Sequence, residues 1–272
     1  MKRATENRES LLLQTPQSLA SRFALDVRVE HEVSAIDPAR KIVHVTDLRD
    51  GMTNEEPYDF VVLAGGATAS RSHTTSAVPT YTLRSVEDVD HITAALASVD
   101  GPAHAVVIGG FIGLEAVENL IGHGVGVTRV QRGPHVLSPL DAEMAARVRA
   151  DLVIEASGVR PEVVIARSAG LTIGPTGGIA VDRHQRTSDP AVFAVGDGVE
   201  KIGVVDASPT LVTMAGLANR HGRAAADAIA GTAQPSRHRR SPTSNSPMRR
   251  NTVRRRMPSI WPDTLRRILL PR

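Results

Sequence analysis

The chain has 272 residues, of which 41% are hydrophobic and only 3% aromatic, and it contains no cysteine. Within these residues, disulfides, thiolate metal sites and a thiol nucleophile are therefore excluded. The net charge of +3 combines two unlike parts: segment 235–272 has eleven arginines and one acid, a net charge of +10, and residues 1–234 have a net charge of −7. The pI of about 9.8 thus reflects the last segment and does not by itself indicate a nucleic-acid-binding fold.

The start of the chain carries no signal for secretion or membrane insertion. After a charged stretch over residues 1–10, the apolar run covers only Leu11–Leu13. A signal-peptide core needs about 7–15 apolar residues and a membrane-spanning helix about 20. We therefore expect a cytoplasmic protein without a membrane partner.

The first predicted elements are short strands. Alternating apolar and polar residues from Asp26 to Thr46, with a turn signal at Asp37-Pro38, predict paired strands. Phe60–Leu63 is a continuous apolar run that ends at Gly65 and Gly66, which predicts a buried strand followed by a tight turn.

A helix is predicted to begin at Ser85, because Ser85 and Asp88 have the spacing of a capping box. The apolar residues that follow recur at helical spacing: Val86, Val89, Ile92 and Leu96. Ala105–Ile108 then predicts a strand, Leu114–Ile121 a helix and Val125–Val130 a strand, which together form one βαβ unit.

The next segment contains an irregular junction. Asp141–Ala150 is helix-like and runs directly into the strand-like Leu152–Ile154, with no turn residue between them. We infer that residues are missing at Ala150/Asp151 relative to a well-formed ancestor. Further on, Val192–Val195 predicts a strand, and the alanine-rich stretch Leu211–Ile229 predicts the last helix, beginning near Thr210.

The strongest motif is the run Thr187–Asp197, TSDPAVFAVGD. It resembles, at every defined position, the second flavin-binding motif of the pyridine nucleotide-disulfide oxidoreductases. A glycine at the end of the strand permits close approach of a ligand, and the carboxylate of Asp197 can accept a hydrogen bond from a ribityl hydroxyl. The positive end of the following helix would then face the flavin pyrimidine.

A second motif, Val106–Glu115, reads VVIGGFIGLE and resembles the nicotinamide-nucleotide fingerprint of the same family. The family pattern is GxGxxG between a strand and a helix, whereas this chain has GGxxG, which is shorter by one residue. Gln131 stands where NAD-specific members have an acid for the ribose hydroxyls, and Arg132 beside it could favour a 2′-phosphate. The choice between NADH and NADPH therefore stays open.

Further segments resemble the family in the expected order along the chain: Leu12–Pro16, Asp59–Ala67, Tyr81–Arg84, Ala156–Pro161 and Ala218–Arg223. The likeness spans Leu11–Gly231 and is greatest to the coenzyme A-disulfide reductase and NADH oxidase branch. It implies an α/β fold with remnants of two Rossmann-like dinucleotide-binding domains. The FAD-binding remnant would comprise 1–84 and 156–234, the NAD(P)-binding remnant 85–155, and the arginine-rich tail 235–272 would be disordered.

The resemblance implies FAD and NAD(P)H as cofactors and a small-molecule electron acceptor. It assigns no catalytic residue or metal ligand, and it implies these cofactor-binding residues: Gly65, Gly66, Gly196, Asp197, Met214 and Ala215 for FAD, and Gly109, Gly110, Gly113, Glu115 and Gln131 for NAD(P)H. His104, His123 and His221 stand singly without ligand spacing, so we interpret them as structural or surface residues.

The chain also departs from the family pattern. The N-terminal GxGxxG strand, the redox cysteine that follows it and the C-terminal dimerisation domain have no counterpart in the sequence, although a homodimer is not incompatible with what remains. We therefore expect an FAD-dependent NAD(P)H oxidoreductase that is weakly active or inactive and does not reduce disulfides on its own. The alternatives are a non-enzymatic truncated remnant of such an enzyme and, less favoured, a basic-tailed nucleic-acid-binding protein.

Overall fold

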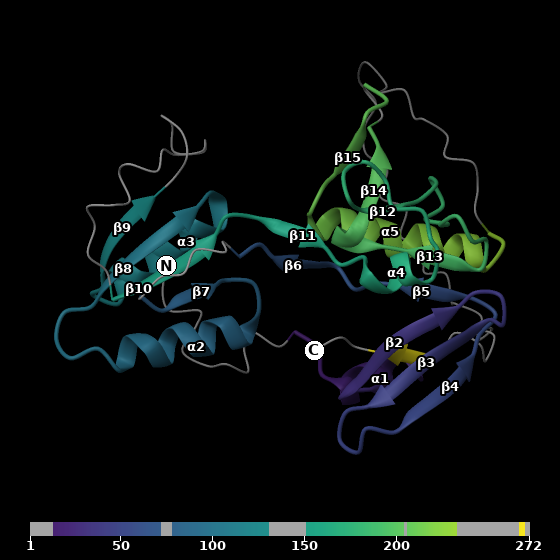
Figure 1. The fold of residues 1–272 in the computed structure, drawn as a ribbon, viewed down its shortest axis with the longest axis horizontal. Helices are drawn as coiled ribbons and strands as arrows, with labels where there is room; N and C mark the ends of the chain where they lie inside the picture. The colour runs from purple at the N-terminus through teal and green to yellow at the C-terminus, as the bar shows by residue number, and fades with distance from the viewer. Residues whose placement is uncertain (1–12, 72–77, 131–150, 204–205, 233–266, 270–272) are drawn as a thin grey trace, which may run out of the picture. The chain divides into compact units, whose positions relative to one another are not determined.

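The computed structural model describes residues 13–71, 78–130, 151–203, 206–232 and 267–269 (Figure 1). They form mixed α/β structure with parallel strand pairs, in agreement with the predicted class. The chain divides into two compact units, the first containing Gly66–Glu162 and the second containing Gln14–Gly65 and Val163–Arg272. The chain passes from one unit to the other at Leu13/Gln14, Gly65/Gly66 and Glu162/Val163. The assignment of an FAD and an NAD(P) domain remains a prediction.

The first unit is built on a four-stranded parallel sheet with the order β7-β10-β8-β9. A separate antiparallel pair joins β6 to β11. The elements are β6 (Ala67–Ala69), β7 (Thr80–Thr82), α2 (Val86–Ala97), β8 (His104–Gly109), α3 (Phe111–Gly122), β9 (Gly126–Val130), β10 (Leu152–Ala156) and β11 (Val159–Pro161). The predicted βαβ unit is confirmed as β8-α3-β9.

The predicted capping box at the start of α2 is present. The Ser85 hydroxyl accepts a hydrogen bond from the Asp88 amide at 3.2 Å, and the Asp88 carboxylate accepts one from the Ser85 amide at 3.1 Å. Satisfying amides that lack an intrahelical partner fixes where the helix begins. Its apolar face packs through Ile92 into a core shared with β8, β10 and α3: Ala105, Val107, Ala116, Leu120, Leu152 and Ile154.

The second unit combines short sheets with three helices among its described residues. Its elements are α1 (Pro16–Phe23), β1 (Asp26–Arg28), β2 (His31–Asp37), β3 (Ile42–Asp47), β4 (Thr53–Pro57), β5 (Val61–Leu63), α4 (Val164–Ser168), β12 (Ile179–Ala180), β13 (Val192–Ala194), the 3₁₀ turn η3 (Gly196–Gly198), β14 (Val199–Ile202), β15 (Pro209–Leu211), α5 (Ala215–Ile229) and β16 (Arg267–Leu269). Strands β2, β3 and β4 form an antiparallel meander, which confirms the paired strands predicted around Asp37-Pro38.

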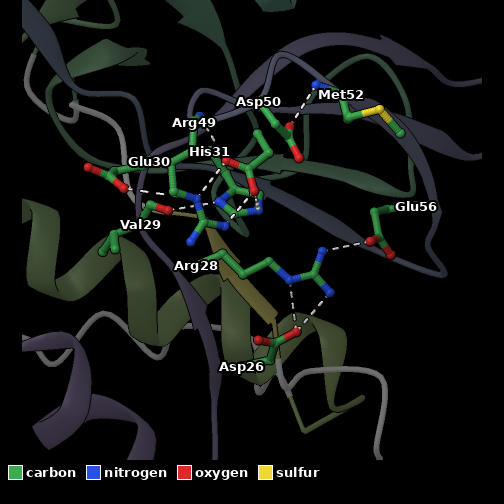
Figure 2. Close-up of polar contacts among 10 residues, drawn as sticks. Asp26, Arg28, Val29, Glu30, His31, Arg49, Asp50, Met52 and Glu56 are labelled. Carbon is green, nitrogen blue, oxygen red and sulfur yellow. Dashed lines mark hydrogen bonds and ion pairs between the residues drawn. The ribbon is translucent and has the colours of Figure 1, made fainter.

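A group of charged side chains lies around β1 and the β3–β4 turn (Figure 2). Arg28 bridges Asp26 and Glu56, with its Nη1 atom 2.7 Å from Oε1 of Glu56. Asp47 pairs with Arg49 and lies 3.7 Å from Nε2 of His31. The hydrogen bonds from Arg49 keep the pKa of the Asp47 carboxyl well below its usual range. These contacts tie the strand ends of the meander together.

Three predictions need correction. The Phe60–Leu63 segment is not buried, because Phe60 is 42% and Val62 39% exposed, and among the described residues β5 pairs only with β13. The last helix begins at Ala215 rather than near Thr210, because Pro209–Leu211 forms the edge strand β15. The tail is not wholly without regular structure, since Arg267–Leu269 pairs in parallel with Asp26–Arg28.

Other predictions fall on residues that are not described. The helix predicted for Asp141–Ala150 lies there, as does most of the segment 235–272. Within the described ranges, none of the helices is long and apolar enough to cross a membrane.

Candidate functional site

The carboxyl ends of β5 and β13 form the framework of the candidate site in the second unit. The two strands are parallel neighbours, with Val192 opposite Val61 and Ala194 opposite Leu63. The pairing continues past the strands, because the Val195 amide donates to the Leu63 carbonyl at 2.9 Å. Strand β13 is fully buried, which holds this edge firmly. In a parallel sheet, residues that follow neighbouring strands lie at one edge, and ligands commonly bind there.

Gly65 and Gly196 follow these two strands, so Gly65 and Asp197 both belong to this edge. Gly196 has φ +85°, a conformation that L residues rarely adopt, and a side chain placed there would meet no atom within 4 Å. Asp197 is half-buried within η3, and Gly65 is exposed. The backbone is therefore open to close approach by a ligand at Gly196, with the carboxylate of Asp197 next to it in the chain.

The rest of the Thr187–Asp197 motif builds the turn before β13. The Thr187 hydroxyl donates to the Val192 carbonyl at 2.9 Å, and Oδ1 of Asp189 accepts from the Ala191 amide at 2.8 Å. These bonds explain why the motif needs short polar residues before the strand. Only its last two residues reach the carboxyl edge.

Helix α5 contacts the η3 turn through His221. The Gly196 amide donates a hydrogen bond to Nδ1 of His221 at 3.2 Å. The sequence predicted His221 to be either a structural or a surface residue. Its side chain is 4% exposed, so it is a buried, structural residue. Because Nδ1 accepts this bond, the proton of the neutral imidazole is on Nε2.

The predicted residues Met214 and Ala215 lie at the start of the same helix. Both are exposed, and no side chain caps the helix at Met214. They precede His221 by about two turns, or roughly 10 Å along the axis. The amide groups of this first turn therefore present the positive end of α5.

Lys201 is a member of this site that sequence reasoning missed. Among the described residues, its Nζ atom and Nε2 of His221 are buried without a hydrogen-bond partner. Burial lowers the pKa of Lys201, and the Asp197 carboxylate opposes that shift. Burial, and then the Lys201 charge, lower the pKa of His221 to about 4, with Asp197 again opposing. The three groups thus interact electrostatically.

The first unit has its own candidate site where β8 passes into α3. Gly109 has φ +147°, and a Cβ there would lie 2.2 Å from the Ala156 carbonyl oxygen on β10. A Cβ on Gly113 would lie 3.4 Å from Val107, so the helix packs closely on the strand. Gly110 precedes α3 and faces open space, without a side-chain cap. The shortened GGxxG motif therefore still forms a strand-turn-helix with an uncapped helix start.

The remaining predicted residues of this unit lie apart from that turn or outside the described residues. Glu115 is exposed one turn into α3, and Gly66 lies at the boundary of the unit, where its carbonyl accepts from the Glu162 amide at 3.0 Å. Gln131 is not described. Sequence reasoning also missed Arg129 on β9, whose Nη2 donates to the Gly109 carbonyl at 3.1 Å and brings a positive charge under the glycine turn.

No group of three or more histidine, aspartate or glutamate side chains suited to a metal ion occurs within the described ranges. The assignment of each of these residues to a cofactor remains a prediction. Each unit has one open glycine turn: Gly110 lies at the start of α3, and Gly196 begins the 3₁₀ turn η3.

Among curated proteins, the chain is similar to coenzyme A disulfide reductases. It is 27% identical over 225 residues to that of Staphylococcus epidermidis, covering 71% of this chain and 51% of the relative. It is 28% identical over 260 residues to one from Staphylococcus aureus, covering 83% and 59%. The chain thus spans between half and three fifths of the length of these relatives.

The chain is also similar to solved structures of oxidoreductases. The reduced CoADR-RHD protein of Bacillus anthracis has a TM-score of 0.75 and 33% identity, with coverage of 85% of this chain and 48% of that one. An NAD-dependent persulfide reductase from A. fulgidus has a TM-score of 0.70 and 30% identity, covering 80% and 47%. The water-forming NADH oxidase of Lactobacillus brevis, with a TM-score of 0.61, 21% identity and coverage of 81% and 57%, shares the fold.

The family model described as pyridine nucleotide-disulphide oxidoreductase matches residues 1–150 and 146–217. The two matched segments overlap over residues 146–150, next to the Ala150/Asp151 junction. Together they cover most of the chain, and the chain belongs to the pyridine nucleotide-disulphide oxidoreductase family.

Proposed function

We propose that this chain is an FAD-dependent NAD(P)H oxidoreductase that works without a cysteine, with FAD bound at the carboxyl edge of β5 and β13. The observation that carries the proposal is the position of Asp197. It follows the buried strand β13 in a turn beside the end of β5, and the amide next to it is held by α5.

The residues present fit a flavin in chemical terms. Gly196 and the exposed Gly65 leave the backbone open, and the Asp197 carboxylate can accept a hydroxyl hydrogen bond. The uncapped first turn of α5, at Met214 and Ala215, offers amide donors of the kind that bind anionic or electron-rich groups. FAD would supply a two-electron carrier at this position.

The nucleotide partner would bind the first unit at the start of α3. Gly110 leaves space beside uncapped amides, which suits a pyrophosphate, and Arg129 adds a positive charge at the Gly109 carbonyl. Glu115 on α3 and Gln131 complete the set that the family likeness assigns to NAD(P)H.

The proposed chemistry needs no thiol. Gly65, Gly196 and Asp197 would hold the flavin, and Gly110 and Arg129 would hold the nicotinamide nucleotide. Together the two cofactors would supply hydride chemistry, and a small acceptor such as dioxygen would take up the two electrons and two protons. Because these 272 residues contain no cysteine, the chain supplies no thiolate to take electrons from the flavin. A small electron acceptor is therefore proposed in place of a disulfide.

Flavin binding by the purified chain tests the proposal directly. Titration with FAD, followed by quenching of flavin fluorescence, should show saturable binding. Asp197→Asn should weaken it by roughly tenfold or more, since a hydrogen bond to a charged group contributes about 1.5–3 kcal/mol. Asp59→Asn is the matched control, because Asp59 is exposed and precedes β5 at the opposite end of the strand.

Each outcome assigns the chain to one class. Saturable binding that depends on Asp197 and leaves Asp59→Asn unaffected supports the flavoprotein. A chain that neither quenches FAD nor retains it on gel filtration would instead be a non-enzymatic relative. Salt-sensitive retention on DNA that is lost when residues 235–272 are removed would favour the nucleic-acid-binding alternative.

A further inference from the structure

Strand β5 has one hydrogen-bonded edge and one edge that is open among the described residues, where it pairs with β13 alone. On the β13 side, the Val61 amide donates to the Ala191 carbonyl at 3.0 Å, and the Leu63 carbonyl accepts from the Val195 amide at 2.9 Å. Successive residues of a strand direct their backbone groups to opposite edges. The N–H and C=O groups of Val62 therefore point away from β13, to the open edge.

The open edge extends by one backbone group on either side of Val62. A trans peptide holds its C=O and N–H groups antiparallel, and the described chain has no cis peptide bond. The Phe60 carbonyl, opposite the Val61 amide in one peptide, thus points to the open edge. So does the Ala64 amide, opposite the Leu63 carbonyl. Along the chain, this edge offers an acceptor, a donor, an acceptor and a donor.

The side chains on one face of this edge are apolar and partly uncovered. Phe193 on β13 is buried against Ala225 and Ala228 of α5. Val62 is opposite Phe193 in the register and so belongs to the same face, yet it is 39% exposed. The Phe60 ring, 42% exposed, meets the Phe193 ring edge to face with centroids 6.1 Å apart. Helix α5 therefore covers β13 and leaves apolar surface on β5.

We propose that the open edge of β5 binds the same edge of a second copy of this chain, antiparallel and about a twofold axis at Val62. Val62 would exchange both hydrogen bonds with Val62 of the partner subunit, and the Ala64 amide would donate to the carbonyl of the partner's Phe60. The order of acceptors and donors along the edge is its own complement when read in reverse. A contact between two identical surfaces requires this property.

Charge and side-chain size agree with this register. Residues 60–66 carry no charged side chain, so no like charges face one another across the axis. Phe60 would lie opposite the partner's Ala64, whose small side chain leaves space for the ring. The contact is short, below the roughly 1,200 Å² that stable interfaces bury, so we expect a reversible dimer that forms as the concentration rises. This inference does not depend on the proposed flavin site.

The test is the oligomeric state of the full chain, measured by sedimentation equilibrium over a wide range of protein concentrations. The wild type should show a reversible monomer–dimer equilibrium. Val62→Lys and Val62→Glu should each weaken dimerisation by about tenfold or more, because either change places two like charges at the axis. Ile202→Lys is the matched control: Ile202 is 60% exposed on β14 of the same unit, outside the proposed contact.

A mixture of the two charged variants tests the register itself. Because position 62 pairs with its counterpart, a dimer of one Val62→Lys chain and one Val62→Glu chain has opposite charges at the axis. The mixture should therefore dimerise at concentrations at which either variant alone is monomeric. A misfolded variant would not show this rescue, and circular dichroism of each variant checks its fold.

Each outcome supports or overturns the proposal. A wild-type chain that stays monomeric at all concentrations overturns it, and so does a dimer that Val62→Lys leaves intact. A mixture that remains monomeric overturns the twofold pairing at Val62. Dimerisation that is lost in both charged variants, kept in Ile202→Lys and restored in the mixture supports the proposal.

Discussion

The Gly196 amide donates a hydrogen bond to Nδ1 of His221, 25 residues further along the chain. This contact fixes the turn that carries Asp197 against the middle of α5. It exists only while the imidazole is neutral, because both ring nitrogens of a protonated histidine are donors. The geometry of the candidate site therefore depends on whether the His221 imidazole is protonated.

Stability should depend on the titration of His221. Its pKa is about 4 in the folded chain and about 6.5 when unfolded, so its contribution is complete above pH 6.5 and is lost as the pH falls towards 4. Between pH 7 and pH 5 the free energy of unfolding should drop by about 2 kcal/mol from this group. Urea unfolding at the two pH values measures the change.

His221→Gln should remove that part of the pH dependence, because glutamine can accept from Gly196 but does not titrate. His123→Gln is the control, since His123 is exposed at the end of α3. Identical pH dependence in the wild type and His221→Gln would contradict the assignment.

Alanine should destabilise the protein strongly at Gly109 and only slightly at Gly110. Gly109→Ala places a Cβ within 2.2 Å of the Ala156 carbonyl oxygen at φ +147°, so both the clash and the backbone conformation oppose it. We expect a loss of about 3 kcal/mol or more in the free energy of unfolding. Gly110→Ala meets no atom within 4 Å and should cost less than about 1 kcal/mol. Denaturant unfolding followed by circular dichroism compares them, and equal losses would disprove the packing argument.

Ser85→Ala should destabilise α2 by about 1 kcal/mol, because it removes the acceptor for the Asp88 amide. Ser98→Ala provides the comparison at the other end of the helix, where the hydroxyl donates to the Ala95 carbonyl. A C-terminal hydroxyl is easily replaced by water, so its loss should be smaller. Thermal unfolding of both variants measures the two losses. A larger loss in Ser98→Ala than in Ser85→Ala would contradict the role of Ser85 as a helix cap.

Asp47→Asn should reduce the pH dependence of the free energy of unfolding at acid pH. The Asp47 pKa is lowered by the hydrogen bonds from Arg49, so its contribution is complete above the ordinary value near 4 and is lost as the pH falls below it. Acid unfolding between pH 4.5 and pH 2 should therefore be shallower in Asp47→Asn than in the wild type. Asp50→Asn keeps an oxygen that can accept from the Met52 amide and should retain the native slope.

The sequence predicts those features that depend on local chemistry. The start of α2 follows from Ser85 and Asp88, and the β8-α3-β9 unit follows from apolar spacing and glycines. Neither depends on distant residues. The family was recognisable for the same reason, because its motifs are short and contiguous.

Features that depend on the neighbours of an element were not predictable. Phe60–Leu63 reads as a buried strand, yet burial depends on how many strands lie beside it. His221 carries no motif, and it reaches the turn that precedes Asp197 only because α5 packs on η3. Pro209, expected near a helix start, instead begins an edge strand that needs no amide there.

Strand β5 combines an apolar sequence with partial exposure, and among the described residues β13 is its one neighbour. Such a strand offers backbone donors and acceptors that an extended peptide of similar character can match. We therefore expect the purified chain to self-associate at high concentration through the unpaired edge of β5. A charged residue at position 62 would act as a gatekeeper against aggregation while leaving the buried strand β13 intact.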